Sequence, residues 1–102
     1  DLDNIEVNNN LKKLDSSDVV ITDTWESMGE IVNEKIIKDF SSYTVNQKMM
    51  SIFGNDCIFM HCLPANRGQE VAPEVIDGPQ SVVWDEAQNR LHIQKEIIKW
   101  CL

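Results

Sequence analysis

The stretch DVVITDTWESMG, residues 18 to 29, joins a short apolar run to a polar loop that ends in glycine. Its first part, DVVIT, is rich in β-branched residues, and two later runs, CIFM at 57 to 60 and SVVW at 81 to 84, are of the same kind. Near-continuous apolar strands favour a sheet that is buried on both faces, in which parallel strands alternate with helices. We therefore predict an α/β fold with three parallel strands.

Helical patterns fill the segments between these runs. After Gly29, apolar residues recur at helical spacing and predict an amphipathic helix. In VNQKMMSIFG, residues 45 to 54, Asn46 can cap a second helix and Gly54 can end it in a left-handed conformation. Val45 can pack on Met50 as a hydrophobic staple. The inner face of the first helix is expected to carry Ile31, Val32, Ile36, Ile37 and Phe40.

The third apolar run is expected to lead into a final helix. A short helical piece around VAPEVI, residues 71 to 76, and a DGP turn at 77 to 79 precede that run. Asp85 is predicted as the N-cap of the final helix, with Gln88 three residues further on. The predicted order is strand, helix, helix, strand, short helix, strand, helix. The apolar side of the final helix would consist of Ala87, Leu91, Ile97, Ile98 and Cys101.

Length and charge restrict the classes of function. The 102 residues suffice for one compact domain or a piece of one, and the Asp at position 1 together with a polar start suggests a fragment or a processed product. A formal net charge of -8 would repel nucleic acid and anionic lipid surfaces. No apolar run approaches the ~20 residues that span a bilayer, and DLDNIEVNNN lacks a signal-peptide pattern. We expect a cytoplasmic protein that binds neither nucleic acid nor membranes.

The cysteines and histidines do not form a recognisable metal or disulfide pattern. Cys57, Cys62 and Cys101 are odd in number and show no CxxC spacing, which favours free thiols in a reducing compartment. His61 and His92 have no ligand spacing relative to these thiols, so no metal site is predicted. Neither a GxGxxG fingerprint nor a P-loop is present, and no cofactor is expected.

Two polar clusters follow the first two predicted strands. Asp23 stands directly after the first strand, and Ser27 to Gly29 form a tight loop before a helix. His61 and Cys62 end the second strand and precede a proline. Because ligands of open parallel sheets bind outside the carboxyl ends of the strands, the two clusters are hypothesised to share one pocket.

Each of these residues also has a plain structural interpretation. An aspartate after a strand most often forms a turn or caps a helix, and a lone His beside a Cys is usually a satisfied edge residue. Met28 would more often serve packing, and Arg90 could pair with Glu86 four residues earlier on the final helix. A Cys62 nucleophile activated by His61 is disfavoured, because adjacent residues of an extended segment point to opposite faces.

Three motifs together resemble the ornithine carbamoyltransferases in the form common in bacteria: DTWESMG at 23 to 29, FMHCLP at 59 to 64 and DEAQNRLHIQK at 85 to 95. The resemblance covers about Ser17 to Leu102. It implies a three-layer Rossmann-like parallel sheet with flanking helices, present here as a partial domain. Residues 1–102 would be the C-terminal part of the ornithine-binding domain, without the carbamoyl-phosphate domain and its Ser-Thr-Arg-Thr-Arg motif.

The resemblance also implies roles for individual residues. Asp23 would bind the α-amino group of L-ornithine, and Ser27 and Met28 would hold its amino-acid end. Cys62 would lie beside the attacking side-chain amine. The loop residues Asn66 and Arg67 are interpreted as structural. The carbamoyl group of carbamoyl phosphate would be bound by His61, Cys62, Leu63 and Arg90, of which His61, Cys62 and Arg90 would be catalytic.

The implied reaction is attack of the neutral δ-amine of ornithine on the carbonyl carbon of carbamoyl phosphate, which gives L-citrulline and phosphate. Negative charge builds on the carbonyl oxygen, where His61 and Arg90 would stabilise it. Relatives are usually homotrimers built through the carbamoyl-phosphate domain, and the resemblance implies arginine biosynthesis, with arginine catabolism as the alternative direction. With half of the site missing, we expect the isolated chain to be inactive and to self-associate or need its other half. The alternatives are a non-catalytic transcarbamylase-like module and a related transcarbamylase that acts on another amine.

Overall fold

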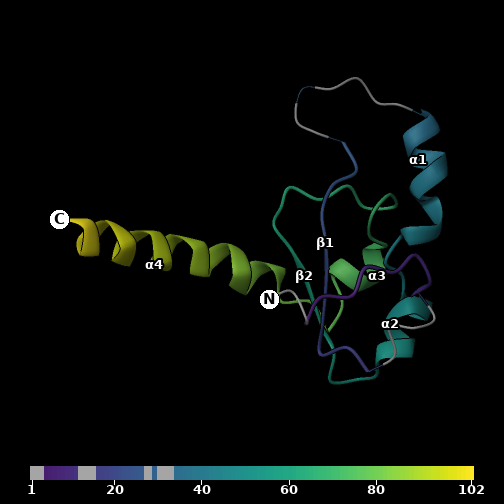
Figure 1. Cartoon of the computed structure of the whole chain (residues 1–102), viewed down its shortest axis with the longest axis horizontal. Helices are drawn as coiled ribbons and strands as arrows, with labels where there is room; N and C mark the ends of the chain where they lie inside the picture. Colours follow the sequence, from purple (N-terminus) through teal and green to yellow (C-terminus); the bar gives the residue numbers. More distant parts are fainter. Residues whose placement is uncertain (1–3, 12–15, 27–28, 30–33) are drawn as a thin grey trace.

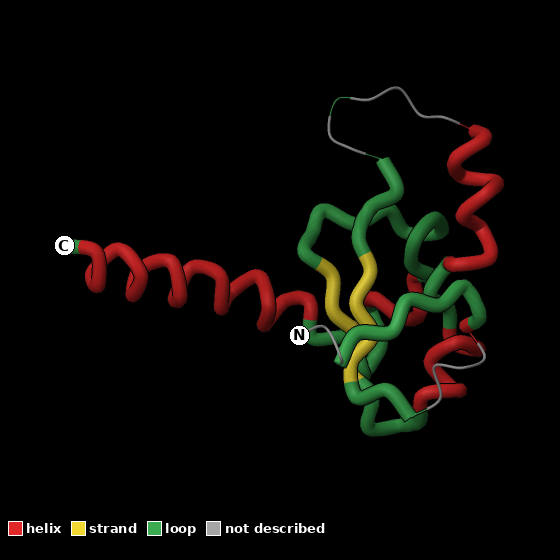
Figure 2. The backbone as a smooth tube through the Cα atoms, in the orientation of Figure 1, coloured by secondary structure: helices red, strands yellow, loops and turns green. Residues whose placement is uncertain are grey.

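The computed structural model describes residues 4–11, 16–26, 29 and 34–102. In chain order these residues form β1 (Val19–Thr22), α1 (Glu34–Phe40), the 3-10 helix η2 (Ser41–Tyr43), α2 (Gln47–Phe53), β2 (Ile58–His61), α3 (Pro73–Ile76) and α4 (Val83–Cys101) (Figure 1). Figure 2 shows the two strands side by side, with the long C-terminal helix running away from the rest of the molecule.

The two strands form a parallel pair, as the sequence predicted. Val19 pairs with Ile58 and Thr22 pairs with His61, so β1 and β2 end at the same edge. The connection between them contains α1, η2 and α2. This register brings the residues that follow each strand, Asp23 and Cys62, to one edge of the sheet.

The prediction of a third strand at 81 to 84 is wrong. Ser81 forms a single parallel bridge to Phe59, and α4 already begins at Val83. A short apolar run cannot be assigned to strand or helix by periodicity alone, and here the acidic side chains of Asp85 and Glu86 favour the start of a helix. The predicted cap is also wrong, because the N-cap residue is Val82, without a side-chain cap, and Asp85 lies in the first turn.

The signals predicted for α2 are largely confirmed. Oδ1 of Asn46 accepts a hydrogen bond from the Met49 amide at 2.9 Å. Val45 and Met50 are both buried in the core. Gly54 has a positive φ of 94°, but its ψ of 174° is extended, so the helix does not end in the left-handed helical conformation that was predicted. The short helix around VAPEVI is confirmed as α3.

The core lies between α2, β2, α3 and the first residue of α4. Phe59 and Val83 are fully buried in it, and Gln80 closes one side by donating from its amide to the carbonyls of Gly54 and Cys57 at 2.9 and 2.7 Å. The buried apolar residues are Val45, Met50, Phe53, Cys57, Phe59, Val71, Val75, Ile76 and Val83.

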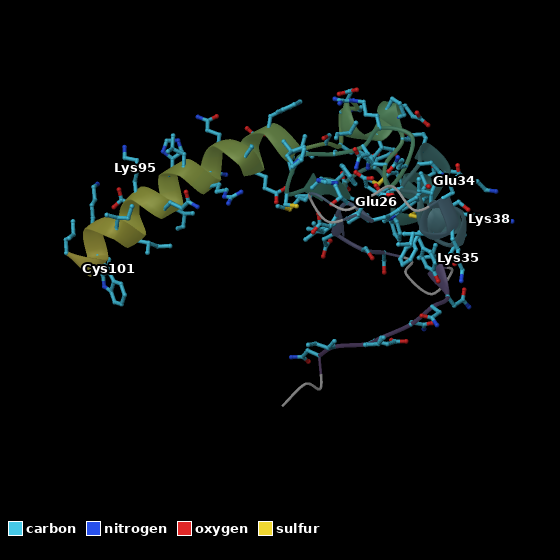
Figure 3. All side chains as sticks on the ribbon, turned by 90° about the horizontal axis from the view of Figure 1, so that it is seen from above. Glu26, Glu34, Lys35, Lys38, Lys95 and Cys101 are labelled. Carbon is cyan, nitrogen blue, oxygen red and sulfur yellow. The ribbon has the colours of Figure 1, made fainter. Side chains whose placement is uncertain are left out.

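The two predicted amphipathic helices are present, but their apolar faces are covered only in part, with Ile36 and Ile37 of α1 half-buried. None of the residues of α1 is buried, and Ile31 and Val32 lie outside the described residues. Beyond Val83, α4 has no buried residue, and Leu91, Ile97 and Ile98 are more than half exposed. Figure 3 shows Lys95 and Cys101 on the part of α4 that projects from the body of the molecule.

Candidate active site

A cavity of about 370 Å³ lies where β1 and β2 end. The predicted residues Asp23, Cys62 and Leu63 all line it, so one residue of each polar cluster, Asp23 and Cys62, reaches the same pocket. The full lining consists of Asp23, Thr24, Glu26, Cys62, Leu63, Pro64 and Asn66.

A second cavity of about 360 Å³ runs along β1 and is lined mainly by apolar side chains such as Val19, Ile21 and Phe53. It holds no carboxylate, imidazole, thiol or basic group among its lining residues. A polar substrate that carries an ammonium group needs an opposite charge, which Asp23 and Glu26 provide in the cavity at the strand ends.

Asp23 and Cys62 are bonded to each other across the first cavity. The Cys62 thiol donates to Oδ1 of Asp23 at 3.1 Å, and the same oxygen accepts the Thr24 amide at 2.7 Å. The hydrogen bond from Cys62 holds the pKa of Asp23 below its usual value, while the same bond with Asp23 raises the pKa of the Cys62 thiol. At neutral pH the pair is therefore a carboxylate next to a protonated thiol.

His61 lies behind the cavity and not in its lining. Its side chain is fully buried, with Nε2 at 3.2 Å from Oε1 of Glu70 and Nδ1 accepting the Leu63 amide at 2.9 Å. Its own backbone amide donates to Oε2 of Glu86 in the first turn of α4. His61 and Cys62 thus point to opposite sides, as expected for adjacent residues of an extended segment. Both ring nitrogens are engaged inside the protein.

Leu63 carries the strained backbone of the site. Its φ of 52° lies in the left-handed region, which a leucine adopts only when its surroundings hold it there. The bond from the Leu63 amide to His61 supplies such a constraint. Loop geometry on this side of the cavity therefore depends on the buried histidine.

The other predicted site residues lie outside the cavity or outside the described residues. Ser27 and Met28 lie outside the described residues. Gly29, which follows them, lies in a turn and has a positive φ of 91°. Arg90 is exposed on α4. The alternative pairing of Arg90 with Glu86 is not seen among the described ion pairs, since Glu86 bonds the His61 amide instead. The catalytic role of Arg90 stays a prediction.

The loop after the cavity is held by polar contacts that sequence reasoning missed. Glu70 is fully buried, and its Oε1 accepts the Asn66 amide at 2.6 Å in addition to facing His61. A carboxylate directly before the apolar pair Val71 and Ala72 was the available signal. Arg67 forms an ion pair with Asp77 at 2.7 Å, which agrees with its predicted structural role.

Two general features of the described residues bear on the class of function. No helix among them is long and apolar enough to cross a membrane. Within the same part of the chain, no three His, Cys, Asp or Glu side chains come together in a way that could hold a metal ion. The charged and reactive side chains that line the cavity are the carboxylates of Asp23 and Glu26 and the thiol of Cys62.

One protein family fits the chain almost from end to end. The sequence pattern of the aspartate/ornithine carbamoyltransferases, in their Asp/Orn binding domain, matches residues 3–101. The chain belongs to this family. The membership confirms the resemblance that the three motifs indicated.

Relatives among the aspartate/ornithine carbamoyltransferases agree with this assignment. An ornithine carbamoyltransferase of Rhodopseudomonas palustris is 60% identical over 86 residues, which make up 84% of this chain and 28% of that protein. The solved ornithine carbamoyltransferase of Pyrococcus furiosus has a TM-score of 0.79 at 48% identity, over 86% of this chain and 28% of that one. A solved N-acetyl-L-ornithine transcarbamylase has a TM-score of 0.73 at 32% identity, over 89% and 29%.

These likenesses confirm the Rossmann-like α/β class that was predicted, with a sheet that is partial in this chain. The chain spans about 28% of the length of the Rhodopseudomonas relative. The match over residues 3–101 establishes carbamoyltransferase family membership for this segment.

Proposed function

We propose that this chain supplies the ornithine side of a carbamoyltransferase site, whose reaction transfers the carbamoyl group of carbamoyl phosphate to the δ-amine of L-ornithine. The observation that carries the proposal is the bond between Cys62 and Asp23 at 3.1 Å in the cavity at the strand ends. A carboxylate there can bind an ammonium group by charge-assisted hydrogen bonds. Family membership supplies the carbamoyl-transfer chemistry.

In the proposed complex Asp23 binds the α-amino group of ornithine, and Ser27 and Met28 hold its amino-acid end. The side-chain amine then lies beside Cys62. Because Asp23 raises the pKa of the Cys62 thiol, the thiol remains protonated and donates a hydrogen bond at neutral pH. Cys62 accordingly positions the amine and does not act as a thiolate base.

The amine must lose a proton before it attacks, since an ammonium of pKa near ~10 has no lone pair. Its attack on the carbonyl carbon forms a tetrahedral intermediate, whose collapse expels phosphate and leaves L-citrulline. Arg90 and the backbone around Cys62 and Leu63 are proposed to stabilise the negative charge on the carbonyl oxygen. Both ring nitrogens of His61 are engaged, so its proposed contribution is to hold the loop in place by accepting the Leu63 amide.

The remaining parts of this function are proposals about a parent protein. A carbamoyl-phosphate domain would complete the site, the parent would be a cytoplasmic homotrimer in arginine biosynthesis, and the isolated 102 residues would be inactive. A second candidate substrate is N-acetyl-L-ornithine, which the likeness to a solved N-acetyl-L-ornithine transcarbamylase favours. A non-catalytic transcarbamylase-like module is the third possibility.

The first test is binding of substrate to the isolated chain. L-ornithine and N-acetyl-L-ornithine are titrated into isotope-labelled protein, and the amide resonances of Thr24, Cys62 and Leu63 are followed. L-ornithine should shift these resonances, and Asp23→Asn should abolish the shifts, whereas Asp39→Asn on exposed α1 should retain them. Equal binding to the Asp23→Asn variant would contradict the proposed ammonium site, and a response to the acetylated amine alone would change the substrate.

The second test is citrulline formation from carbamoyl phosphate and L-ornithine. The chain is assayed alone and mixed with the N-terminal portion of a full-length relative, such as the Rhodopseudomonas protein. We expect activity only in the mixture. An enzyme-like rate from the chain alone would refute the proposal that it carries only half of the site. No activity from the mixture, when the two proteins are shown to associate, would favour the non-catalytic module.

A further inference from the structure

Glu70 is the one fully buried acidic residue among those that the structure describes, and it faces the back of the candidate site. Its Oε1 lies 3.2 Å from Nε2 of His61 and accepts the Asn66 amide at 2.6 Å. Its Oε2 has no hydrogen-bond partner among the described residues. Placing a carboxylate in the interior costs free energy unless it is bonded, so one oxygen makes both of the compensating contacts.

These contacts fix the tautomer of the His61 ring. The Leu63 backbone amide lies 2.9 Å from Nδ1 of His61, and a backbone N-H can only donate. Nδ1 therefore carries a lone pair, and the single ring proton of a neutral imidazole is on Nε2. Nε2 in turn donates to Oε1 of Glu70. Glu70 selects this tautomer because its Oε1 accepts the proton on Nε2. With that proton on Nε2, Nδ1 is free to accept the Leu63 amide.

The Glu70 carboxylate is connected to the loop of the site by two sets of hydrogen bonds. Through His61 it holds the amide of Leu63, whose φ of 52° needs such a constraint. Directly, it holds the amide of Asn66 at 2.6 Å. Cys62 and Leu63 both line the cavity and lie on the stretch of chain that these two bonds secure.

We propose that Glu70 is a positioning residue: by accepting from His61 and Asn66 it sets the His61 tautomer and fixes the loop that presents Cys62 and Leu63 to the cavity. The importance of this loop for catalysis rests on the proposed carbamoyltransferase function. The contacts themselves do not depend on it. A plain packing role for Glu70 is the competing explanation, because the side chain also fills space beside buried Val71.

Two substitutions separate these explanations. Glu70→Gln keeps a carbonyl oxygen that can accept both N-H groups, whereas Glu70→Met keeps a similar volume and cannot accept either. Glu74→Gln, in the first turn of α3 and exposed, is the matched control for the loss of one negative charge. All variants are made in the 102-residue chain and need no substrate.

The first readout is the nitrogen spectrum of the His61 ring near neutral pH. The wild type, Glu70→Gln and Glu74→Gln should show a proton on Nε2 and none on Nδ1, whereas Glu70→Met should show a mixture of the two tautomers. A wild-type ring protonated on Nδ1 would overturn the proposal by itself. This outcome is decisive even if Glu70→Met fails to fold.

The second readout is hydrogen exchange at the Leu63 and Asn66 amides. Loss of one hydrogen bond at each should speed exchange by roughly tenfold in Glu70→Met, and Glu70→Gln should restore slow exchange. Equal protection in Glu70→Gln and Glu70→Met would show a packing role and refute the proposal. If these results hold while L-ornithine does not bind, the substrate assignment has failed and the positioning role of Glu70 has not.

Discussion

The thiol of Cys62 donates a hydrogen bond to Oδ1 of Asp23 over 3.1 Å, although the two residues are 39 positions apart in the sequence. Each residue directly follows one strand of the parallel pair. The bond therefore couples the electrostatics of the two strand ends. Both residues are exposed, so their chemistry can be probed directly in solution.

Substitution of Asp23 should increase the reactivity of Cys62. The carboxylate raises the pKa of the thiol by accepting its hydrogen bond and by charge repulsion of the thiolate. Asp23→Asn removes the charge and should lower the pKa of Cys62, so that more thiolate is present near neutral pH. The rate of alkylation by iodoacetamide, measured against pH in a Cys101→Ser background, checks this.

In the same alkylation assay Asp39→Asn is the charge control. Asp39 is exposed on α1, and its substitution should leave the rate at Cys62 unchanged. Buried Cys57 should contribute little to the signal. An equal alkylation rate at Cys62 with and without Asp23→Asn, both in the Cys101→Ser background, would contradict the hydrogen bond between Asp23 and the thiol.

The stabilisation that this pair provides should be confined to a window of pH. The folded-state pKa of Asp23 lies below its ordinary 3.8, so its contribution is present above that value and is lost as pH falls through the folded pKa. The folded-state pKa of Cys62 lies above its ordinary 9.0, so its contribution is present below 9.0 and is lost as pH rises through the folded pKa.

The free energy of unfolding of wild type minus that of Asp23→Asn should therefore be constant between these limits and shrink on both sides. Urea denaturation at a series of pH values, followed by circular dichroism, measures the difference. A difference that keeps growing above pH 9.0 would have the opposite sign to the shift of Cys62 and would disprove the pairing.

Removal of the cap of α2 should destabilise the protein modestly. Oδ1 of Asn46 accepts from the Met49 amide, and replacement of such a cap by alanine costs about 1 kcal/mol in the free energy of unfolding. Asn46→Gly should cost only a few tenths of that amount, as glycine is a far better N-cap residue than alanine. Equal costs for the two variants in urea denaturation would argue against a capping role.

The Gln80 side chain should stabilise the turn that precedes β2. Its amide donates to the carbonyls of Gly54 at 2.9 Å and Cys57 at 2.7 Å. Gln80→Ala leaves both carbonyls without this donor and should lower the free energy of unfolding by about 2 kcal/mol. Gln47→Ala, at an exposed position at the start of α2, should change it little. Similar losses in both variants would mean that the amide bonds contribute nothing.

The sequence predicted best those helices that are set by signals within their own segment, such as a cap or a glycine stop. The cap at Asn46 and the stop near Gly54 lie within the segment that they control, and α2 was predicted accordingly. The apolar run at 81 to 84 contains no cap or stop signal, and the acidic residues that favour a helix come only after it. Its assignment depends on a single bridge to Phe59 and on the contact of Glu86 with His61, 25 residues away. Periodicity over four residues cannot contain that information.

Some features of the candidate site could likewise be predicted from the sequence, and others could not. Asp23 and Cys62 were predicted to share a pocket because strand ends of parallel sheets converge, which is a rule of topology. That His61 faces the interior follows from the alternation of side chains along an extended segment, but its partner Glu70 could not be named, because the intervening loop sets that contact. The setting of Arg90 depends on where α4 projects, which its own sequence does not determine.

The parallel pairing of β1 with β2 also has a consequence for the time course of folding. Every bond of this ladder closes a loop that contains α1, η2 and α2, so the entropy of that closure opposes the pairing until it is complete. We expect α2, with its local cap, to gain protection first in pulse-labelled refolding. The cavity at the strand ends would then be among the last features of the molecule to exist.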